Sequence, residues 1–493
     1  MTSTIVDRDR EAGLTVSKDS FDRVPPLVVD LDGTCVKTGL LLEFLLALLK
    51  ESPRYFFLLP VWMLKGKAYL ARQVALRASL DVSLLPYRTE FVDYLKRQRS
   101  RARSIVVATA TDGKMTRQVA DYLMLFDGIL SNDGSKTLSN KLQRDRLVRK
   151  FGEGGFDYAT SGRSDLAIAS SARKVILVQP SRRAELAVPR VAEVERVFED
   201  RKLRLVDYLA PLRPQHWLKN LLAFVPVLAA HRFYEILLLE KSLVAFASLC
   251  CCASSGYLFN DLFDLSADRH HLRKRFRPFA AGDLPLSYAL VMISGLVLLG
   301  CLAGSFVSPS FVAMLLGYFI LTLTYSLYIK RVVLLDVMVL AGLYTLRIMA
   351  GSAAVDIWPS PWLLAFSTFL FLSLALVKRY SELVIMRKID GDAAKARSYE
   401  LGDAELLAAN GTASSYVAVF VLALYITSGP AGTLYGRHEV IWFLCPLLLY
   451  WINRMWLMAH RGKMPDDPVV FAAMDSTSRI LILLMLGTAV LAL

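Results

Sequence analysis

The 493-residue sequence predicts two domains of different fold class. The first is an N-terminal α/β domain with a helical cap, and the second is a C-terminal all-α membrane domain of nine transmembrane helices. Before residue 187, short apolar strands that end in polar residues alternate with helix-permissive segments. From about residue 213 onward, apolar runs follow one another, and most are long enough to cross a bilayer. The boundary between these two patterns predicts the division of the chain.

Composition narrows the class of partner. Hydrophobic residues make up 55% of the chain, and the formal net charge is +14. Positive charge can indicate nucleic-acid binding, but in a membrane protein it more often reflects cytoplasmic loops and contact with anionic lipid. We therefore expect a membrane and no nucleic acid as a partner. The six cysteines have no metal-ligand spacing, and a disulfide framework is not expected.

The N-terminal half divides into three segments. Residues 1–23 form a polar tail of mixed charge, unlike a cleaved signal peptide. The α/β domain is expected over 24–186, and a charged linker over 187–212. Two apolar stretches, 40–49 and 55–64, are too short to span a bilayer and fit the helical cap. Their side chains either pack in the core or rest on the membrane surface, and both interpretations stay open.

An apolar strand that ends in Asp30-Leu31-Asp32-Gly33-Thr34 brings two carboxylates to the C-terminal edge of a sheet, where α/β folds build their sites. This arrangement suits a nucleophilic Asp30 with Asp32 as acid/base, around Mg²⁺. A second apolar strand ends at Thr109, Lys141 follows, and Asp165 supplies another acid after a short strand.

This order of residues, over 24–185, resembles the haloacid dehalogenase superfamily of phosphatases. The resemblance implies a role for each residue: nucleophile for Asp30, general acid/base for Asp32, phosphate holders for Thr109 and Lys141, and a metal-supporting acid for Asp165. The last motif of that family usually reads Gly-Asp-Ser-x-x-Asp, whereas Ser161 stands here at the first acidic position. An active phosphatase and a degenerate scaffold or regulatory domain therefore remain alternatives.

The domain expected over 213–493 contains nine apolar spans. They lie near 218–231, 242–262, 285–306, 310–329, 334–354, 362–384, 413–430, 438–457 and 476–493. Loops on one side of these spans carry thirteen Lys and Arg residues, and loops on the other side carry three. The positive-inside rule then predicts a plasma-membrane protein of bacterial type, with a cytoplasmic N-terminal domain and the C-terminus outside.

An acidic cluster lies at the end of the second span. Asp261, Asp264 and Asp268 are spaced i, i+3, i+7, so on one helix they share a face. Carboxylates at the mouth of a membrane helix are costly unless a cation holds them. Mg²⁺ prefers oxygen ligands and often shares them with phosphates, so a magnesium ion with a diphosphate is the expected occupant.

Further polar residues lie at or inside the spans and are candidates for substrate binding. They are Lys219, Tyr325, Lys330, Arg347, Lys378, Arg379 and Glu382, with Arg275 and Arg277 in the basic loop after the acidic cluster. A lone cation at a helix end usually extends to the lipid headgroups. Here the cations recur beside the acidic cluster on one side of the membrane, which favours phosphate binding.

The motif Asn260-Asp261-x-x-Asp264-x-x-x-Asp268 resembles the UbiA-type intramembrane prenyltransferase superfamily over about 210–493. The resemblance implies nine helices around a central cavity open to lipid. Most members join an isoprenoid diphosphate to an aromatic acceptor and carry a second Asp-x-x-x-Asp motif after the fourth span. Here the corresponding range, 325–336, contains one Asp and two cations, which argues against the aromatic reaction.

Four stretches, 212–220, 274–282, 344–351 and 378–383, resemble the branch of decaprenyl-phosphate phosphoribosyltransferases. The resemblance implies transfer of 5-phosphoribose from phosphoribosyl diphosphate to a polyprenyl phosphate. The three aspartates would hold Mg²⁺, and Asn260 would orient the site. The phosphates would be held by Arg275, Arg277, Lys330 and Lys378.

The fused N-terminal domain could then remove the 5-phosphate, for synthesis of a cell-envelope glycan or an arabinose donor. Two alternatives remain open at this point. One is an aromatic prenyltransferase of the quinone or haem type, and the other is a non-catalytic scaffold of the cell envelope.

Overall fold

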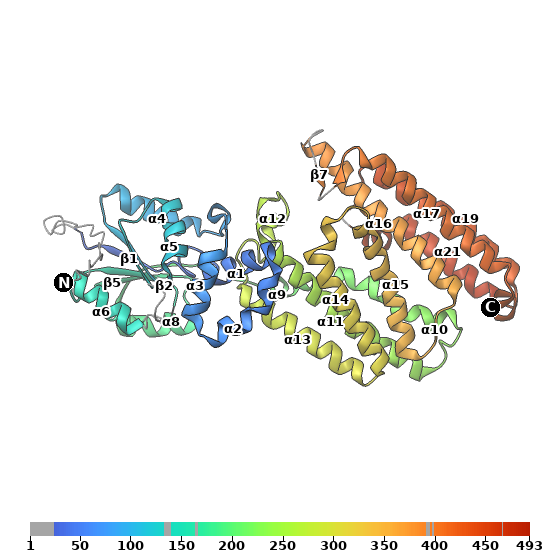
Figure 1. The fold of residues 1–493 in the computed structure, drawn as a ribbon, viewed down its shortest axis with the longest axis horizontal. Coiled ribbons are helices and arrows are strands. Elements are labelled where there is room, and N and C mark those ends of the chain that lie inside the picture. Colours follow the sequence, from blue (N-terminus) through green and yellow to red (C-terminus); the bar gives the residue numbers. More distant parts are fainter. Residues whose placement is uncertain (1–23, 133–139, 163–165, 391–394, 397–398, 466) are drawn as a thin grey trace, which may run out of the picture. The chain divides into compact units, whose positions relative to one another are not determined.

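The computed structural model describes residues 24–132, 140–162, 166–390, 395–396, 399–465 and 467–493 (Figure 1). The chain forms two compact units. The first comprises Met1–Leu203 and Ser266–Leu286, and the second comprises Arg204–Leu265 and Ser287–Leu493. The acidic cluster expected at residues 261–268 therefore has members in both units.

The first unit is built on a six-stranded parallel sheet in the order β3-β2-β1-β4-β5-β6. The strands are β1 (Leu27–Val29), β2 (Ile105–Asp112), β3 (Gly128–Asn132), β4 (Asp157–Thr160), β5 (Lys174–Val178) and β6 (Glu193–Phe198). The expectation of an α/β domain is thus confirmed. Strand β6 lies inside the range expected to be a linker, and it pairs with β5. The folded part of the first unit therefore continues beyond residue 186.

Helices cover both faces of the sheet, as parallel sheets require. Leu27 and Val29 pack with side chains of α4 (Thr89–Ser100) and α5 (Gly113–Leu123). Val28 points to the opposite face, where it packs with side chains of α6 (Asn140–Phe151) and α7 (Leu166–Ala169). The alternation follows from the two-residue period of a strand. Helices α8 (Arg182–Ala187) and η5 (Val188–Arg190) lie between β5 and β6 in the chain.

The expected cap consists of α1 (Leu40–Glu51), η2 (Pro53–Phe57), α2 (Leu59–Leu64) and α3 (Lys67–Arg77), and η3 (Val82–Leu84) follows. Helix α1 buries Phe44 and Leu48 in a small apolar core. Helix α2 and the residues before it leave Phe57 and Leu64 exposed. The segment 266–286, with most of α12 (Leu265–His270) and all of η8 (Lys274–Phe276), also belongs to this unit.

The second unit is helical. It contains α9 (Leu205–Leu209), η6 (Ala210–Leu212), η7 (Pro214–Phe224), α10 (Val225–Ala229), α11 (Ile236–Phe263), α13 (Leu286–Ser305), α14 (Pro309–Leu327), η9 (Ile329–Arg331), α15 (Leu335–Val355), α16 (Pro361–Asp390), α17 (Asp403–Ile426), α18 (Gly429–Leu434), η11 (His438–Phe443), α19 (Leu444–His460), α20 (Pro468–Met474) and α21 (Ser476–Ala492). A short antiparallel pair, β7 (Lys395–Ala396) and β8 (Tyr399–Glu400), follows α16.

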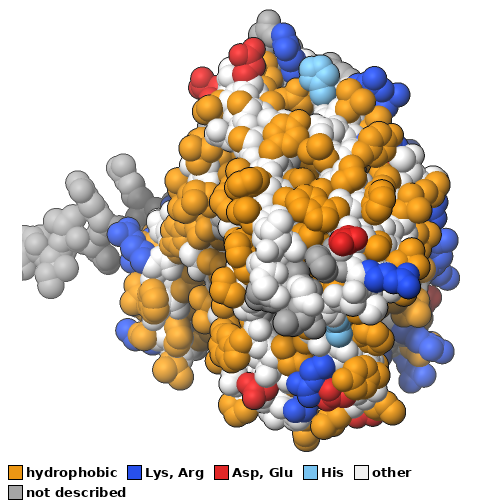
Figure 2. Space-filling model, turned by 90° about the vertical axis from the view of Figure 1, so that its right-hand side faces the viewer, with side chains coloured by type: hydrophobic (Ala, Val, Ile, Leu, Met, Phe, Trp, Pro, Cys, Tyr) orange, Lys and Arg blue, Asp and Glu red, His pale blue; other side chains and the backbone are white. Residues whose placement is uncertain are grey.

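Within the described residues, seven helices are long and apolar enough to cross a membrane. Helices α20 and α21, bent by 85°, make an eighth if they count as one span. The chain is therefore a multi-pass membrane protein. Figure 2 shows hydrophobic side chains spread over much of the face drawn, with a small number of charged side chains among them.

The expectation of nine spans needs correction at 218–231. That range contains parts of η7 and α10, which are too short to count as a span. Pro214 is the first residue of η7 and Pro226 the second residue of α10, and a proline there fits a helix start better than a helix interior. Lys219 and Asn220 are also buried in the unit instead of facing outward. Polar side chains directed inward explain why this apolar run does not form a lipid-facing helix.

Candidate functional site

The sequence candidates of the first unit gather at one edge of the sheet. Asp30 and Asp32 follow β1, Thr109 lies in β2, which continues to Asp112, and Ser161 follows β4. The strand order reverses at β1, because β2 and β3 lie on one side of it and β4 to β6 on the other. Crevices at such a switch point are where open α/β sheets bind ligands. The topology therefore brings these four residues to the position where a site is expected.

Asp32 is the carboxyl with the most defined surroundings. The backbone N–H of Leu40 donates to its Oδ1 at 2.9 Å, and the Thr111 hydroxyl donates to its Oδ2. Burial raises the pKa of Asp32, while these two hydrogen bonds and the charge of Lys67 act in the opposite direction. A carboxyl with a raised pKa keeps its proton longer, which suits a general acid. The neighbouring Asp30 accepts a hydrogen bond from the backbone of Leu31 at 2.9 Å.

Ser161 lies against the loop that carries both aspartates. Gly33 has φ +74°, and the Ser161 Oγ lies 2.7 Å from the position that a Cβ on residue 33 would take. Glycine is needed here for both its backbone conformation and its lack of a side chain. Lys141 is exposed in the first turn of α6 and has no hydrogen bond or ion pair within the described ranges. Asp165 lies outside the described residues.

The acidic motif of the second unit lies where α11 ends. Helix α11 stops at Phe263, and Asp264 has φ −98° and ψ 8°, outside the helix. The expectation that all three aspartates share a face of one helix is therefore wrong, because a new helix, α12, begins after this break. Asp268 lies in α12 and belongs to the first unit, where it accepts a hydrogen bond from Arg277 at 2.7 Å.

Cations from distant segments hold the other members of the motif. Arg213, which lies between η6 and η7, forms an ion pair with the buried Asp261. The ammonium of Lys330, in η9, lies 2.7 Å from both oxygens of Asp264 and 3.0 Å from Asn260 Oδ1. Carboxylate and amide oxygens are ligands that suit Mg²⁺. In the described ranges, however, no three His, Cys, Asp or Glu side chains lie close enough together to hold a metal.

Three expected substrate-binding cations belong to the helical unit: Lys219, Lys378 and Arg347. Lys219 forms an ion pair with Asp467, and its ammonium lies 5.4 Å from the centre of the Tyr344 ring. Lys378 interacts electrostatically with the same carboxylate. Both Lys219 and Arg347 are buried, which excludes extension to the lipid headgroups for these two side chains.

Arg347 has three polar partners. Its guanidinium donates to Asn220 Oδ1 at 2.9 Å, to the Leu343 carbonyl at 2.7 Å and to the Tyr318 hydroxyl at 2.7 Å. It also lies over the rings of Tyr318 and Tyr344. Such contacts hold a cation in a fixed orientation within an apolar surrounding.

Arg379 and Glu382 have partners of a different kind. Arg379 is 1% exposed and forms ion pairs with Asp336, which is fully buried, and with Glu382. The Tyr399 hydroxyl donates to Asp336 at 2.6 Å. These contacts join α15, α16 and β8, so the group stabilises the packing of the helices. Tyr325 is half-buried on α14 and Arg275 is exposed in η8.

Asp467 is a further candidate site residue, which the sequence does not single out. It lies in the same cluster as Lys219, although 248 residues separate the two in the chain. Its side chain also accepts hydrogen bonds from the backbone of Val469 and Val470 and thereby caps α20. An aspartate directly before Pro468 is a typical helix start, and this pattern could have drawn attention to it.

Comparison with protein families matches residues 221–485 to the UbiA prenyltransferase family. The chain belongs to this family. The acidic motif at the end of α11 and Lys330 fall within the matched region, whereas Arg213 and Lys219 lie just before it. The N-terminal α/β domain lies outside it.

Three relatives extend the comparison. An uncharacterised protein of Sinorhizobium fredii, y4nM, is 34% identical over 467 residues, which cover 93% of this chain and 89% of that protein. Nodulation protein NoeC of Azorhizobium caulinodans is 36% identical over 287 residues, or 57% of this chain and 92% of that protein. Decaprenyl-phosphate phosphoribosyltransferase of Mycobacterium tuberculosis is 35% identical over 179 residues, or 35% of this chain and 58% of that protein.

A solved structure of a UbiA homologue from Archaeoglobus fulgidus, bound to GPP and Mg²⁺, is more distant. It is 16% identical with a TM-score of 0.43, and the alignment covers 57% of this chain and 99% of that chain.

Proposed function

We propose that the helical unit transfers 5-phosphoribose from phosphoribosyl diphosphate to a polyprenyl phosphate. The observation that carries the proposal is the position of Lys330. Where most relatives of this type would have a second acidic motif, the chain has a lysine whose ammonium contacts Asp264 and Asn260 of the first motif. The single acid of residues 325–336, Asp336, is buried with Arg379 and Tyr399. A second metal-binding carboxylate pair is therefore absent from this part of the described chain.

The chemistry follows from the charges. An oxygen of the acceptor phosphate attacks C1 of the ribose, the bond from C1 to the diphosphate oxygen breaks, and diphosphate leaves. The acceptor is already an anion, so no strong general base is needed. Lys330 and Lys219 offset the negative charge of the phosphates. Asp261 and Asp264 would hold Mg²⁺, which would stabilise the leaving diphosphate. A metal role for Asp268 stays a prediction from the sequence.

Membranes that contain the full-length protein provide the test. Labelled phosphoribosyl diphosphate and polyprenyl phosphate should yield a labelled lipid, with Mg²⁺ required. Asp261→Asn should abolish the product, whereas Asp356→Asn, at the far end of α15, is a matched control that should not. An aromatic prenyltransferase would instead consume an isoprenoid diphosphate and ignore phosphoribosyl diphosphate. A scaffold would turn over neither substrate.

A second candidate function concerns the first unit. We propose that it hydrolyses the 5-phosphate of the phosphoribosyl lipid, with Asp30 as nucleophile and Asp32 as acid/base. Asp30 attacks phosphorus, Asp32 gives its proton to the departing sugar oxygen, and water then hydrolyses the aspartyl phosphate. The raised pKa of Asp32, caused by its burial, supports the acid role. The Asp30 carboxylate suits Mg²⁺, which would offset charge on the phosphate, and a metal role for Asp32 stays a prediction from the sequence.

Purified full-length protein and labelled phosphoribosyl lipid test this second proposal. Wild type should release inorganic phosphate, and Asp30→Asn should stop the release. Absence of release from wild type would leave the degenerate domain as the correct interpretation. The proposed topology, with the first unit in the cytoplasm, predicts that the soluble donor is used only from that side.

A further inference from the structure

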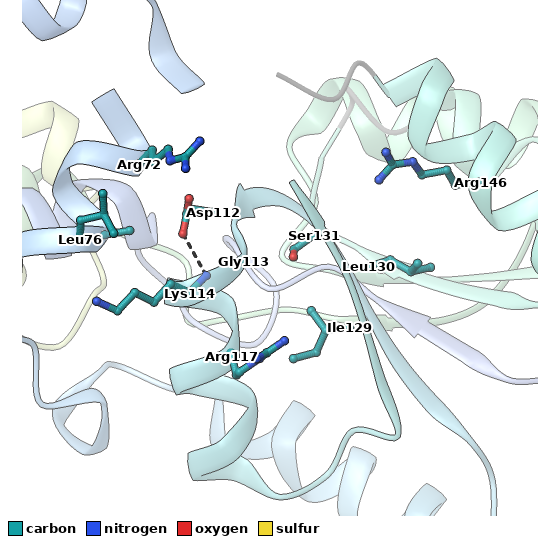
Figure 3. A pocket seen from close by; sticks show the side chains of 11 residues that line it. Arg72, Leu76, Asp112, Gly113, Lys114, Arg117, Ile129, Leu130, Ser131 and Arg146 are labelled. Atoms are coloured by element: carbon teal, nitrogen blue, oxygen red, sulfur yellow. Dashed lines mark hydrogen bonds between the residues drawn. The ribbon is translucent and has the colours of Figure 1, made fainter. Parts of the chain in front are cut away.

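The first unit contains a basic pocket that neither proposed reaction uses. The pocket has a volume of about 600 Å³ and lies between α3, α5, β3 and α6 (Figure 3). Four cationic side chains line it: Arg72, Lys114, Arg117 and Arg146. In Figure 3 the three guanidinium groups approach the space from three different sides. We refer to this space as the arginine pocket.

Among the described residues, ion pairs do not balance the charge of the arginine pocket. Asp112 is the only carboxylate among the lining residues, and it accepts a hydrogen bond from the backbone of Lys114 at 2.9 Å, capping α5. Within the described ranges, none of the four cations forms an ion pair with an acidic side chain. Arg144, two residues before Arg146 on α6, does not line the pocket and does have such a partner in Glu153. Unpaired, convergent guanidinium groups are the usual recognition device for phosphate.

The arginine pocket adjoins the aspartates of the first unit. Thr111, whose hydroxyl contacts Asp32, directly precedes Asp112 in the wall of the pocket. Helix α3 makes the same connection, because Lys67 at its start acts electrostatically on Asp32 and Arg72 lines the pocket. Five residues of helix separate these two cations, which is about 7.5 Å along the helix axis. Short stretches of β2 and α3 therefore link the surroundings of Asp32 to the wall of the pocket.

From this geometry we infer that the arginine pocket binds a second phosphate of the substrate, one that is not hydrolysed. The inference rests on the proposed phosphatase function and names its substrate class: a sugar phosphorylated at two positions. One phosphate lies at Asp30, and the other, a diester in the lipid-linked substrate, lies among the guanidinium groups. Leu76, Ile129 and Leu130 also line the pocket and offer an apolar wall to the first part of a lipid chain.

Direct binding tests the inference on the full-length protein. In an Asp30→Asn background neither probe is hydrolysed, and calorimetry gives the dissociation constants of ribose 1,5-bisphosphate and ribose 5-phosphate. We expect the bisphosphate to bind at least tenfold more tightly. Arg117→Gln with Arg146→Gln should bring the ratio of the two constants close to one. Both side chains are exposed, so the fold should be retained, and circular dichroism checks this.

Arg149→Gln is the matched control, because Arg149 lies on the same helix and is exposed but does not line the pocket. It should leave the ratio unchanged. Equal affinity for the two probes in the parent protein, or a ratio that survives the double substitution, overturns the inference. Failure of the phosphatase proposal is detected separately, by the absence of phosphate release from wild type. In that case, tighter binding of the bisphosphate by the Asp30→Asn protein, lost in the double arginine variant, still supports a site for bisphosphorylated sugars.

Discussion

One ion pair joins the segment 266–286 to the cap of the first unit, and its removal is a sharp test of the structure. Arg269 donates to both carboxylate oxygens of Glu43, at 2.6 and 3.0 Å. The Thr38 hydroxyl donates to the same carboxylate at 2.7 Å, and Arg269 Nε donates to the Ala280 carbonyl at 3.0 Å. The side chains of Glu43 and Arg269 are 2% and 7% exposed, so the pair is shielded from water.

The magnitude of the effect follows from this burial. Glu43→Leu leaves the guanidinium of Arg269 buried without a counter-charge, and removing one partner of a buried pair costs about 3–5 kcal/mol. Every 1.4 kcal/mol is about tenfold in an equilibrium constant, so opening of the segment should become more than about a hundredfold more frequent. The double variant Glu43→Leu with Arg269→Met removes both charges and should regain most of the loss.

Hydrogen–deuterium exchange of the full-length protein measures this opening at the amides of 266–286. Glu51→Leu is the matched control, because Glu51 lies on the same helix α1 but is exposed, and it should leave exchange unchanged. Unchanged protection in Glu43→Leu would refute the inference that the pair holds the segment. A double variant as unprotected as the single one would show that the loss does not come from the lone buried charge.

Three further predictions concern the candidate sites. A raised pKa means that the folded protein binds the proton of Asp32 more tightly than the unfolded chain, so stability falls as pH rises through the interval between the two pKa values. Asp32→Asn should therefore raise the melting temperature at pH 7, lose this advantage below about pH 4, and abolish phosphate release. Lys330→Met removes a charge-assisted contact and should lower kcat/KM for phosphoribosyl diphosphate by about tenfold to a hundredfold, with Lys330→Arg closer to wild type. Arg379→Met leaves the charge of the buried Asp336 without its guanidinium partner and should lower the free energy of unfolding by about 3–5 kcal/mol. Asp336→Asn in the same chain should restore most of this loss. An Arg379→Met variant that is as stable as wild type but has lost transfer activity would instead indicate that Arg379 binds substrate.

Much of the first unit follows from local patterns. A short apolar strand that ends in Asp30 and Asp32 predicts a site at a sheet edge, and the strand order brings Thr109 and Ser161 to the same edge. Strand β6 is not apparent in the sequence because three of its six residues, Glu193, Glu195 and Arg196, are charged and lie within a charged stretch. An edge strand of a sheet carries exposed polar side chains, so its sequence resembles a linker.

In the helical unit, composition predicts the long helices but not their internal polar contacts. The run at 218–231 has the composition of a span, yet the partners of Lys219 and Asn220 direct it into the unit. Those partners, Asp467 and Arg347, are distant in the chain, and no local pattern pairs them. The same holds for Glu43 and Arg269, which are 226 residues apart. Charged groups are buried where tertiary contacts supply their partners, and the spacing of residues within one segment does not reveal those partners.

These contacts also explain how an acidic motif can exist beside apolar helices before any substrate binds. Asp261 and Asp264 are held by Arg213 and Lys330, so the charges of the motif are already balanced. An unpaired charge in such a surrounding would cost several kcal/mol. A magnesium diphosphate brings both a cation for the carboxylates and anions for the two basic side chains. On the proposed function, substrate binding is therefore an exchange of partners, in which Arg213 and Lys330 pass from the carboxylates to the phosphates without leaving a buried charge uncompensated.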